Sequence, residues 1–144
     1  MFKVDFTENL IIEFKSDKDC LGDNEIIDAV GAFANTEGGD LYLGIENDGE
    51  VTGLHKNHLD ATQLAAFIAN KTVPPVPVRI DVINYGLPVL KIAVPKRTSI
   101  VAASSGKIQR RRIKADGTPE NIPMYPYEIA TRLSSLSLLD YSAS

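Results

Sequence analysis

The stretch from residue 32 to residue 45 restricts the fold more than any other part of this sequence, because a helix end, two glycines and a strand follow one another without a spacer. Apolar residues between positions 26 and 34 recur at the spacing of one helical face. Gly38 and Gly39 end that helix, since glycine adopts the left-handed backbone conformation at little cost. Residues 40–46 then carry an apolar side chain at every second position, which is typical of a strand. We therefore expect a tight helix-to-strand turn in which at least one of the two glycines has a positive φ angle.

Strand and helix signals alternate over the rest of the chain. Asp23 is expected to cap the first helix, and Asp60 to cap a second helix that ends before Pro74. Pro126 stands at a suitable first position for a third helix. The expected strands are residues 10–15, 40–46, 51–54, 78–83, 87–94 and 107–113. This order predicts a mixed α/β (α+β) fold, with a mixed sheet and about three helices packed against it.

The length of 144 residues predicts a single domain over residues 1–144 that buries its own core. The one cysteine, Cys20, excludes an internal disulfide and a cysteine-based zinc site. The sequence has no apolar run of membrane-helix length and no signal-peptide pattern, so we expect a cytoplasmic protein without a membrane partner. The apolar residues 138–141 suggest one module of a longer protein, with a further module after Ser144.

The charge is divided unevenly along the chain. Residues 1–60 hold 14 acids and 4 bases, whereas residues 61–144 hold 5 acids and 11 bases. Five of the eight residues 107–114 are basic, and Ile108 and Ile113 have opposite parity, so a regular strand here has no consistent apolar face. An edge strand or a projecting hairpin fits this pattern. Its bases suit contacts with nucleic-acid phosphates, or they protect an exposed sheet edge.

Five further strings accompany the stretch 32–45: Glu8, Glu13-Phe14-Lys15, Gly53-Leu54, Ala93-Val94-Pro95 and Ile122-Pro123-Met124. Together they resemble the AlbA-type domain of the Schlafen superfamily. Bacterial members of that family are described as DNA-binding domains of transcriptional regulators and helicase-like proteins, and the related Alba proteins form dimers. Residues 98–103 lack the proline and aromatic residues that relatives often carry there. Relatives often have one Arg-x-Gly within the later basic segment, and which arginine of 107–114 corresponds to it stays open.

The resemblance and the basic segment together predict a nucleic-acid-binding domain of a transcriptional regulator, acting as a homodimer without a cofactor. DNA and RNA are both open as partners. The residues expected to contact phosphates are Lys15, Lys96, Arg97, Lys107, Arg110, Arg111, Arg112 and Lys114. We expect the arginines and Lys114 to lie on one exposed edge.

An enzyme is the alternative hypothesis. Some Schlafen relatives are ribonucleases that use three acids, and Glu8, Glu13 and Glu46 resemble the matching positions. Such a set would hold Mg²⁺ or Mn²⁺ for a metal-dependent endoribonuclease. If the strands 10–15 and 40–46 are neighbours, Glu13 and Glu46 share an outward sheet surface with Tyr42, and a bend near Asn9 would be needed to bring Glu8 to the same side. A protein-interaction module is a third hypothesis.

The two histidines complete the candidate residues. His55 and His58 stand three positions apart, but no third strong metal ligand lies near them in the sequence, so we expect both on the surface. No Ser/His/Asp triad can be recognised in the sequence.

Overall fold

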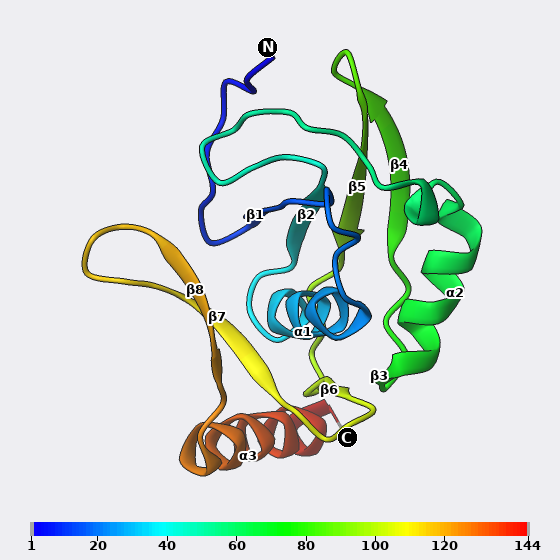
Figure 1. Cartoon of the computed structure of the whole chain (residues 1–144). Helices are drawn as coiled ribbons and strands as arrows, with labels where there is room; N and C mark the ends of the chain where they lie inside the picture. Colours follow the sequence, from blue (N-terminus) through cyan, green and yellow to red (C-terminus); the bar gives the residue numbers. More distant parts are fainter. Residues whose placement is uncertain (1, 144) are drawn as a thin grey trace.

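The computed structural model describes residues 2–143, with side chains described from residue 2 to residue 136. The helices are α1 (Asp23–Ala34), α2 (Ala61–Lys71) and α3 (Pro126–Ala143), with a short 3-10 helix η1 (Lys56–His58). The strands are β1 (Ile12–Lys15), β2 (Gly39–Leu43), β3 (Thr72–Val73), β4 (Arg79–Asn84), β5 (Pro88–Val94), β6 (Ala102–Ala103), β7 (Gln109–Ile113) and β8 (Pro119–Pro123). The mixed α+β fold predicted from the sequence is confirmed (Figure 1).

The core is built around a four-stranded sheet with the strand order β1-β2-β5-β4. β1 and β2 are parallel, whereas the other two pairs are antiparallel. Helix α1 packs on one face of the sheet, where Phe33 of the helix and Leu41 of β2 are fully buried. On the other face, Phe14 and Tyr42 pack against Phe6 of the N-terminal segment. Both faces are covered, so the expectation that Tyr42 lies on an outward surface is wrong, and its burial raises its pKa to about 12.

The two glycines occupy the predicted helix-to-strand turn. Gly38 has φ 70° and Gly39 has φ 149°, which confirms the expectation of a positive φ angle. A Cβ atom on Gly38 would lie 2.7 Å from the backbone nitrogen of Lys96, and one on Gly39 would lie 2.5 Å from the carbonyl oxygen of Ile11 and 2.6 Å from the ring of Phe33. Backbone angle and space both require glycine here, because neighbouring segments approach the turn on each side.

The helix starts follow the sequence signals in part. The side chain of Asp60 caps α2 by accepting hydrogen bonds from the backbone of Thr62 and Gln63, as expected. At α1 the cap position is taken by Gly22, which has no side chain to offer, and Asp23 is the first helical residue. Asp23 is therefore not the cap, although an acid in the first turn still interacts favourably with the helix dipole.

The return strand expected over residues 51–54 does not form. A single bridge joins Ile45 to Val51, and the backbone amides of Thr52 and Gly53 both donate to the carbonyl of Gly44. Two amides that converge on one carbonyl produce a bend rather than a ladder. The strands expected over residues 78–83 and 87–94 are present as β4 and β5, which pair as an antiparallel hairpin.

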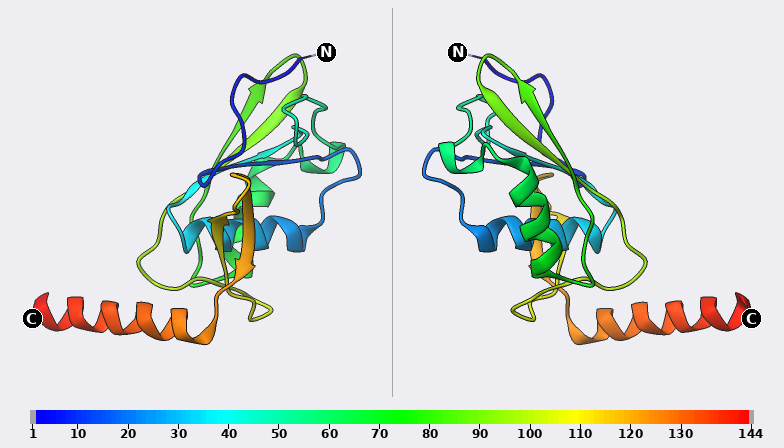
Figure 2. Two further views of the ribbon diagram at one scale, coloured as in Figure 1. Left: turned by 90° about the vertical axis from the view of Figure 1, so that its left-hand side faces the viewer. Right: turned by 90° about the vertical axis from the view of Figure 1, so that its right-hand side faces the viewer.

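The β7–β8 hairpin and α3 lie outside the four-stranded sheet. β7 and β8 pair with each other as a two-stranded hairpin that projects from the body (Figure 1). Helix α3 begins at Pro126, as predicted, and extends away from the rest of the molecule (Figure 2). Among residues 2–143, no helix combines the length and the apolar character that a membrane crossing requires.

Candidate nucleic-acid interface

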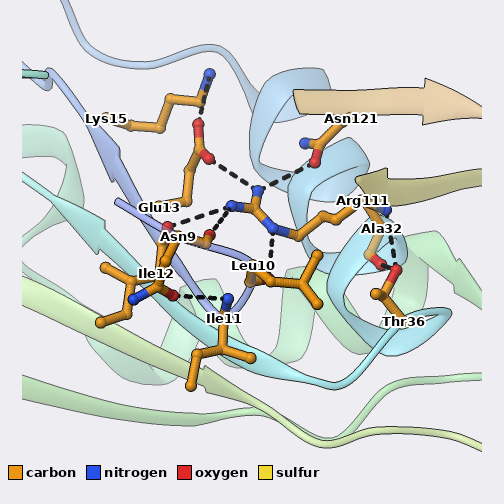
Figure 3. Close-up of polar contacts among 10 residues, drawn as sticks. All are labelled: Asn9, Leu10, Ile11, Ile12, Glu13, Lys15, Ala32, Thr36, Arg111 and Asn121. Atoms are coloured by element: carbon orange, nitrogen blue, oxygen red, sulfur yellow. Dashed lines mark hydrogen bonds and ion pairs between the residues drawn. The ribbon is translucent and has the colours of Figure 1, made fainter. Parts of the chain in front are cut away.

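Arg111 in β7 is the centre of the contacts that hold the β7–β8 hairpin against the sheet (Figure 3). Only 2% of its surface is exposed, so the prediction that it lies on an exposed edge is wrong. Its guanidinium carbon lies 4.4 Å from the centroid of the Phe33 ring in α1, a cation–π contact. Arg111 is therefore part of the core and has no face toward an incoming phosphate.

The polar contacts of Arg111 account for all five N–H groups of its guanidinium. Its Nη1 donates to the Oε2 of Glu13 at 2.8 Å, which places a carboxylate against the buried positive charge. The remaining acceptors are the Oδ1 of Asn121 and the backbone carbonyls of Leu10, Asn9 and Ile12. A buried charge with a full set of partners costs much to disturb, because any lost partner leaves it unpaired in a medium of low dielectric constant.

The carbonyls converge on Arg111 because the chain turns sharply before β1. The backbone amides of Asn9 and Ile12 each donate to the carbonyl of the other residue, and the side chain of Asn9 accepts from the amide of Ile11. This is the bend near Asn9 that the carboxylate hypothesis required. Its effect is to present three backbone oxygens to β7.

The end of α1 holds the hairpin at a second place. The hydroxyl of Thr36 accepts from the backbone amide of Arg111 at 2.9 Å. The side-chain amide of Asn35, a buried residue, donates to the carbonyls of Gln109 and Val101, both at 2.8 Å. The hairpin is thus attached by side chains of the same 32–45 stretch that restricts the fold.

The outer face of β7 carries Arg110 and Arg112, which point away from Arg111 because side chains alternate along a strand. Arg112 pairs with Glu120 of β8, its cross-strand neighbour, at 2.6 Å. Arg110 pairs with Glu128 in the first turn of α3. Arg112 is exposed, whereas Arg110 is only partly exposed, and both already have an acidic partner.

A cleft of about 450 Å³ lies where the hairpin turn faces the start of β1. Lys15 and Lys114 line it together with Glu8 and Glu13, and Asn47, Thr7, Thr118 and Pro119 complete its walls. Lys15 lies 3.6 Å from the carboxylate of Glu13. The cleft thus combines two bases with two acids.

Glu8 is protonated more readily than an ordinary glutamate. Burial, followed by the charge of Glu13 and a hydrogen bond with it, raises the pKa of Glu8 to about 7. Near neutral pH this carboxyl is therefore protonated in part of the molecules, so the negative charge of the cleft depends on pH.

The other three predicted phosphate contacts lie elsewhere. Lys96 pairs with Glu37 at 3.2 Å, and the backbone amide of Arg97 donates to the carbonyl of Ala34, so both bases lie beside the last turn of α1. Lys107 pairs with Asp28 at 2.9 Å and lines a different cleft, whose lining does not include Lys15. The predicted set is therefore divided between several surfaces.

The three acids of the enzyme hypothesis are only partly brought together. Glu8 and Glu13 are neighbours, but the register pairs Glu13 with Leu41, which places Glu13 on the face covered by α1. Glu46 lies beyond β2 and accepts a hydrogen bond from Thr52 at 2.6 Å. Over the described residues, the structure contains no group of three His, Cys, Asp or Glu side chains that could hold a metal ion. This donor set does not fit a bound Mg²⁺ or Mn²⁺.

Sequence reasoning missed two features of the molecule. The sequence carried only one sign that Arg111 is buried, which is the opposite parity of Ile108 and Ile113. That pattern indicated an edge strand and not an inward arginine. His58, expected on the surface, is buried against Asp17. No local signal marks that pair, because its members are 41 residues apart.

The Schlafen AlbA_2 family matches residues 8–120, and this chain belongs to that family. The match includes the bend at Asn9, the glycine turn and both strands of the hairpin up to Glu120.

Two solved structures are similar to this chain. The crystal structure of the DIP2311 protein from Corynebacterium diphtheriae shares 23% identity with a TM-score of 0.61 and covers 80% of this chain. The solution structure of the N-terminal domain of a protein described as related to the ATP-dependent DNA helicase RecG, from Nitrosomonas europaea, shares 26% identity with a TM-score of 0.43 and covers 65% of this chain. The chain spans 25% of the length of the first structure and 66% of the second.

Proposed function

We propose that this domain binds the phosphate backbone of nucleic acid along the outer face of the β7–β8 hairpin and the rim of the adjoining cleft. Arg110, Arg112 and Lys114 are the principal contacts, with Lys15 at the rim. Arg111 is excluded from this set because it is buried. The proposed site recognises the charge of the phosphates and not the nucleotide sequence. It consists of flexible basic side chains and has no side chain directed at the nucleobases.

The observation that carries the proposal is the anchoring of the hairpin. Residues 107–123 contain five bases and two acids, and Arg111 fixes them to the sheet through contacts with residues 9–13. A projecting hairpin that is held in place presents its exposed charges in one arrangement. Binding then costs less conformational entropy than it would on a flexible arm.

The acidic partners of the two outer arginines do not prevent such binding. Ion pairs at a surface contribute only about 0–1 kcal/mol, because water and salt screen them. Glu120 and Glu128 therefore hold Arg112 and Arg110 in the unbound protein and can be replaced by phosphate oxygens. Phosphate accepts the same paired N–H groups as a carboxylate.

The biological setting is proposed from the family. The resemblance to DNA-binding domains of transcriptional regulators favours a regulator that is cytoplasmic, dimeric and built with a further module. Light scattering on the purified domain tests whether it forms a dimer, which should have twice the mass of 15.7 kDa.

Salt-dependent binding is the test of the phosphate contacts. We would replace Arg110, Arg112 and Lys114 together by alanine and titrate labelled duplex DNA and single-stranded RNA at several salt concentrations. The matched control replaces Lys56, Lys71 and Arg79, which are exposed bases outside the hairpin and its cleft, and removes the same charge. The hairpin variant should bind all sequences more weakly and lose up to about 3 units of log–log salt slope, at about 0.9 per contact on duplex DNA. Equal losses in both variants would show attraction by net charge alone and would overturn the proposed site.

A further inference from the structure

Asp17 and Cys20, which are three residues apart, meet the distant His58 before α1, at the end of that helix opposite the hairpin attachment. Asp17, which is fully buried, lies 2.8 Å from the Nδ1 of His58 through either carboxylate oxygen. The Nε2 of the same ring lies 3.9 Å from the Sγ of Cys20. Carboxylate, imidazole and thiol are therefore arranged in the order in which an acid orients a base and the base faces a nucleophile.

The hydrogen bonds decide which nitrogen of His58 carries the proton. A carboxylate can only accept, so the Nδ1 of His58 holds a hydrogen and the Nε2 of the neutral ring presents its lone pair to Cys20. Asp17 is itself held by the backbone amides of Leu21 and His55, at 2.9 and 2.8 Å. It can therefore stabilise the positive charge that appears on His58 when the ring accepts the thiol proton.

Cys20 is held in an unusual backbone conformation at this place. It has φ 60° and is the one described residue other than glycine with a positive φ angle. A side chain in that region is strained, and such strain persists where the surroundings impose it. The amide of Cys20 donates to the carbonyl of Asp17, and the side-chain amide of Asn57 lies 3.7 Å from the Sγ.

The thiol is reachable from outside. Cys20 is partly exposed and lines a cleft of about 390 Å³ together with His58 and Asn57. The same cleft is bordered by Asp23, Asp60, Gln63, Leu64 and Phe67. Its size admits a small molecule with a few carbon atoms on each side of a reactive group.

We propose that Cys20 is a nucleophilic thiol, with His58 as its base and Asp17 as the residue that positions the base, and that it exchanges with small neutral or cationic disulfides that enter this cleft. The thiol proton moves to the Nε2 of His58, and the sulfur attacks one sulfur of the disulfide. A bond forms between Cys20 and that sulfur while the original S–S bond breaks. The leaving thiolate takes the proton from His58, so the products are a mixed disulfide on Cys20 and one free thiol.

The preference for the charge of the disulfide follows from the residues around the thiol. Asp23 from α1 and Asp60, which caps α2, are the carboxylates at the rim of the cleft, and no lysine or arginine lines it over the described residues. An anionic disulfide is therefore repelled at the point where it must approach, whereas a cationic one is attracted. This selectivity concerns a surface separate from the hairpin, so it can fail or hold independently of nucleic-acid binding.

The rate of mixed-disulfide formation tests the proposal on the parent chain. Because Cys20 is the only cysteine, a mass increase after reaction with 2-hydroxyethyl disulfide reports this thiol alone. The folded chain should react at pH 6.5 at least about tenfold faster than the same chain unfolded in urea, with both rates corrected against a free small thiol in the same solvents. A folded chain that reacts no faster than the unfolded chain would overturn the proposal.

Variants separate an activated thiol from a merely accessible one. His58→Asn and Asp17→Asn should each lower the exchange rate at pH 6.5 by about tenfold or more, and His58→Asn should change the shape of the pH–rate profile, because the base that accepts the thiol proton is removed. Circular dichroism identifies any variant that fails to fold, and in that case the comparison of folded and unfolded parent decides. A folded His58→Asn variant with the parental rate and profile would contradict the role of His58.

A charge series tests the selectivity. Cystamine should react faster than 2-hydroxyethyl disulfide, and dithiodiglycolate more slowly, once each rate is divided by that of a free thiol. Asp60→Asn is a matched variant, since asparagine also caps helices, and it should reduce the ratio of cystamine to dithiodiglycolate rates by about two- to fivefold. An unchanged ratio would show that the rim carboxylates do not select the ligand.

Discussion

Arg111 and Arg112 are adjacent in β7 and have opposite roles. Arg111 is buried with five acceptors and an aromatic ring, whereas Arg112 is exposed and has one acidic partner. The difference arises because a strand turns successive side chains to opposite faces. Three consecutive arginines therefore contain one residue that holds the hairpin and two that lie on its outer face, each paired with a glutamate. Composition alone does not distinguish them.

The largest expected effect on stability comes from replacing Arg111, on the inner face of the hairpin. Arg111→Met should destabilise the fold by about 3–5 kcal/mol, because it leaves Glu13 and several carbonyls without their partner. Urea unfolding followed by circular dichroism measures this change. Arg112→Met, the matched change on the outer face, should cost less than about 1 kcal/mol. Similar losses for both variants would contradict the division of the hairpin into an inner and an outer face.

Two glycines allow a second comparison, because the space around one is filled by neighbouring atoms and the space around the other is open. Gly39 and Gly86 both have positive φ angles, but a Cβ atom on Gly39 would meet the carbonyl of Ile11 and the ring of Phe33, whereas one on Gly86 would meet open space. Gly86→Ala should cost about 1 kcal/mol through backbone strain alone, and Gly39→Ala about 2–3 kcal/mol through strain and displacement of the ring against which Arg111 packs. Thermal unfolding of the two variants measures the difference. Equal shifts in melting temperature would show that packing at the turn adds nothing.

The raised pKa of Glu8, which lines the cleft beside the hairpin, makes the stability of the fold depend on pH. The folded-state pKa of Glu8 is raised from 4.5 to about 7, so between these values the folded chain keeps a proton that the unfolded chain has lost. The free energy of unfolding therefore falls as the pH rises from about 4.5 to about 7. Glu8→Gln, which imitates the protonated form, should be more stable than the parent at pH 8 and equally stable at pH 4. A difference that is constant over this range would contradict the raised pKa.

The smallest expected effect concerns the outer face alone. Glu120→Gln frees Arg112 from its carboxylate and should tighten nucleic-acid binding about two- to threefold while changing stability by less than about 0.5 kcal/mol. Titrations at low salt measure the binding. Glu25→Gln, on α1 away from the hairpin, removes the same charge and serves as the control. Weaker binding by Glu120→Gln would indicate that the Arg112–Glu120 pair is itself part of the interface.

Local patterns predicted most of the elements correctly. The spacing of apolar residues located α1 and β2, Asp60 located the start of α2, and Pro126 located the start of α3. The strings that resemble the Schlafen AlbA domain identified the family. These signals are short-range, since helix periodicity, caps and glycine turns depend on residues within a few positions of one another.

The predicted phosphate contacts do not lie on one edge, since Lys96, Arg97 and Lys107 lie outside the hairpin face and Arg111 is buried. The basic segment does form a projecting hairpin, but Arg111 turns inward to residues about 100 positions earlier in the chain. The carboxylate hypothesis met the same difficulty, because the pairing of β1 with β2 places Glu13 beside Leu41 and toward α1. A shift of strand register by one residue reverses every side chain, and the register is fixed only when the strands meet.

The sequence by itself determined the three helices, the glycine turn and the family, because each depends on neighbours along the chain. Tertiary structure alone decided which arginine is buried, that Glu8 meets Glu13 across the bend at Asn9, and that Asp17, Cys20 and His58 converge. Desolvation and partner geometry set the role of a charged or nucleophilic side chain, and both are properties of the folded environment. Residues of the same type, three of them consecutive in β7, therefore differ in burial and in partners according to the side of the strand on which they lie.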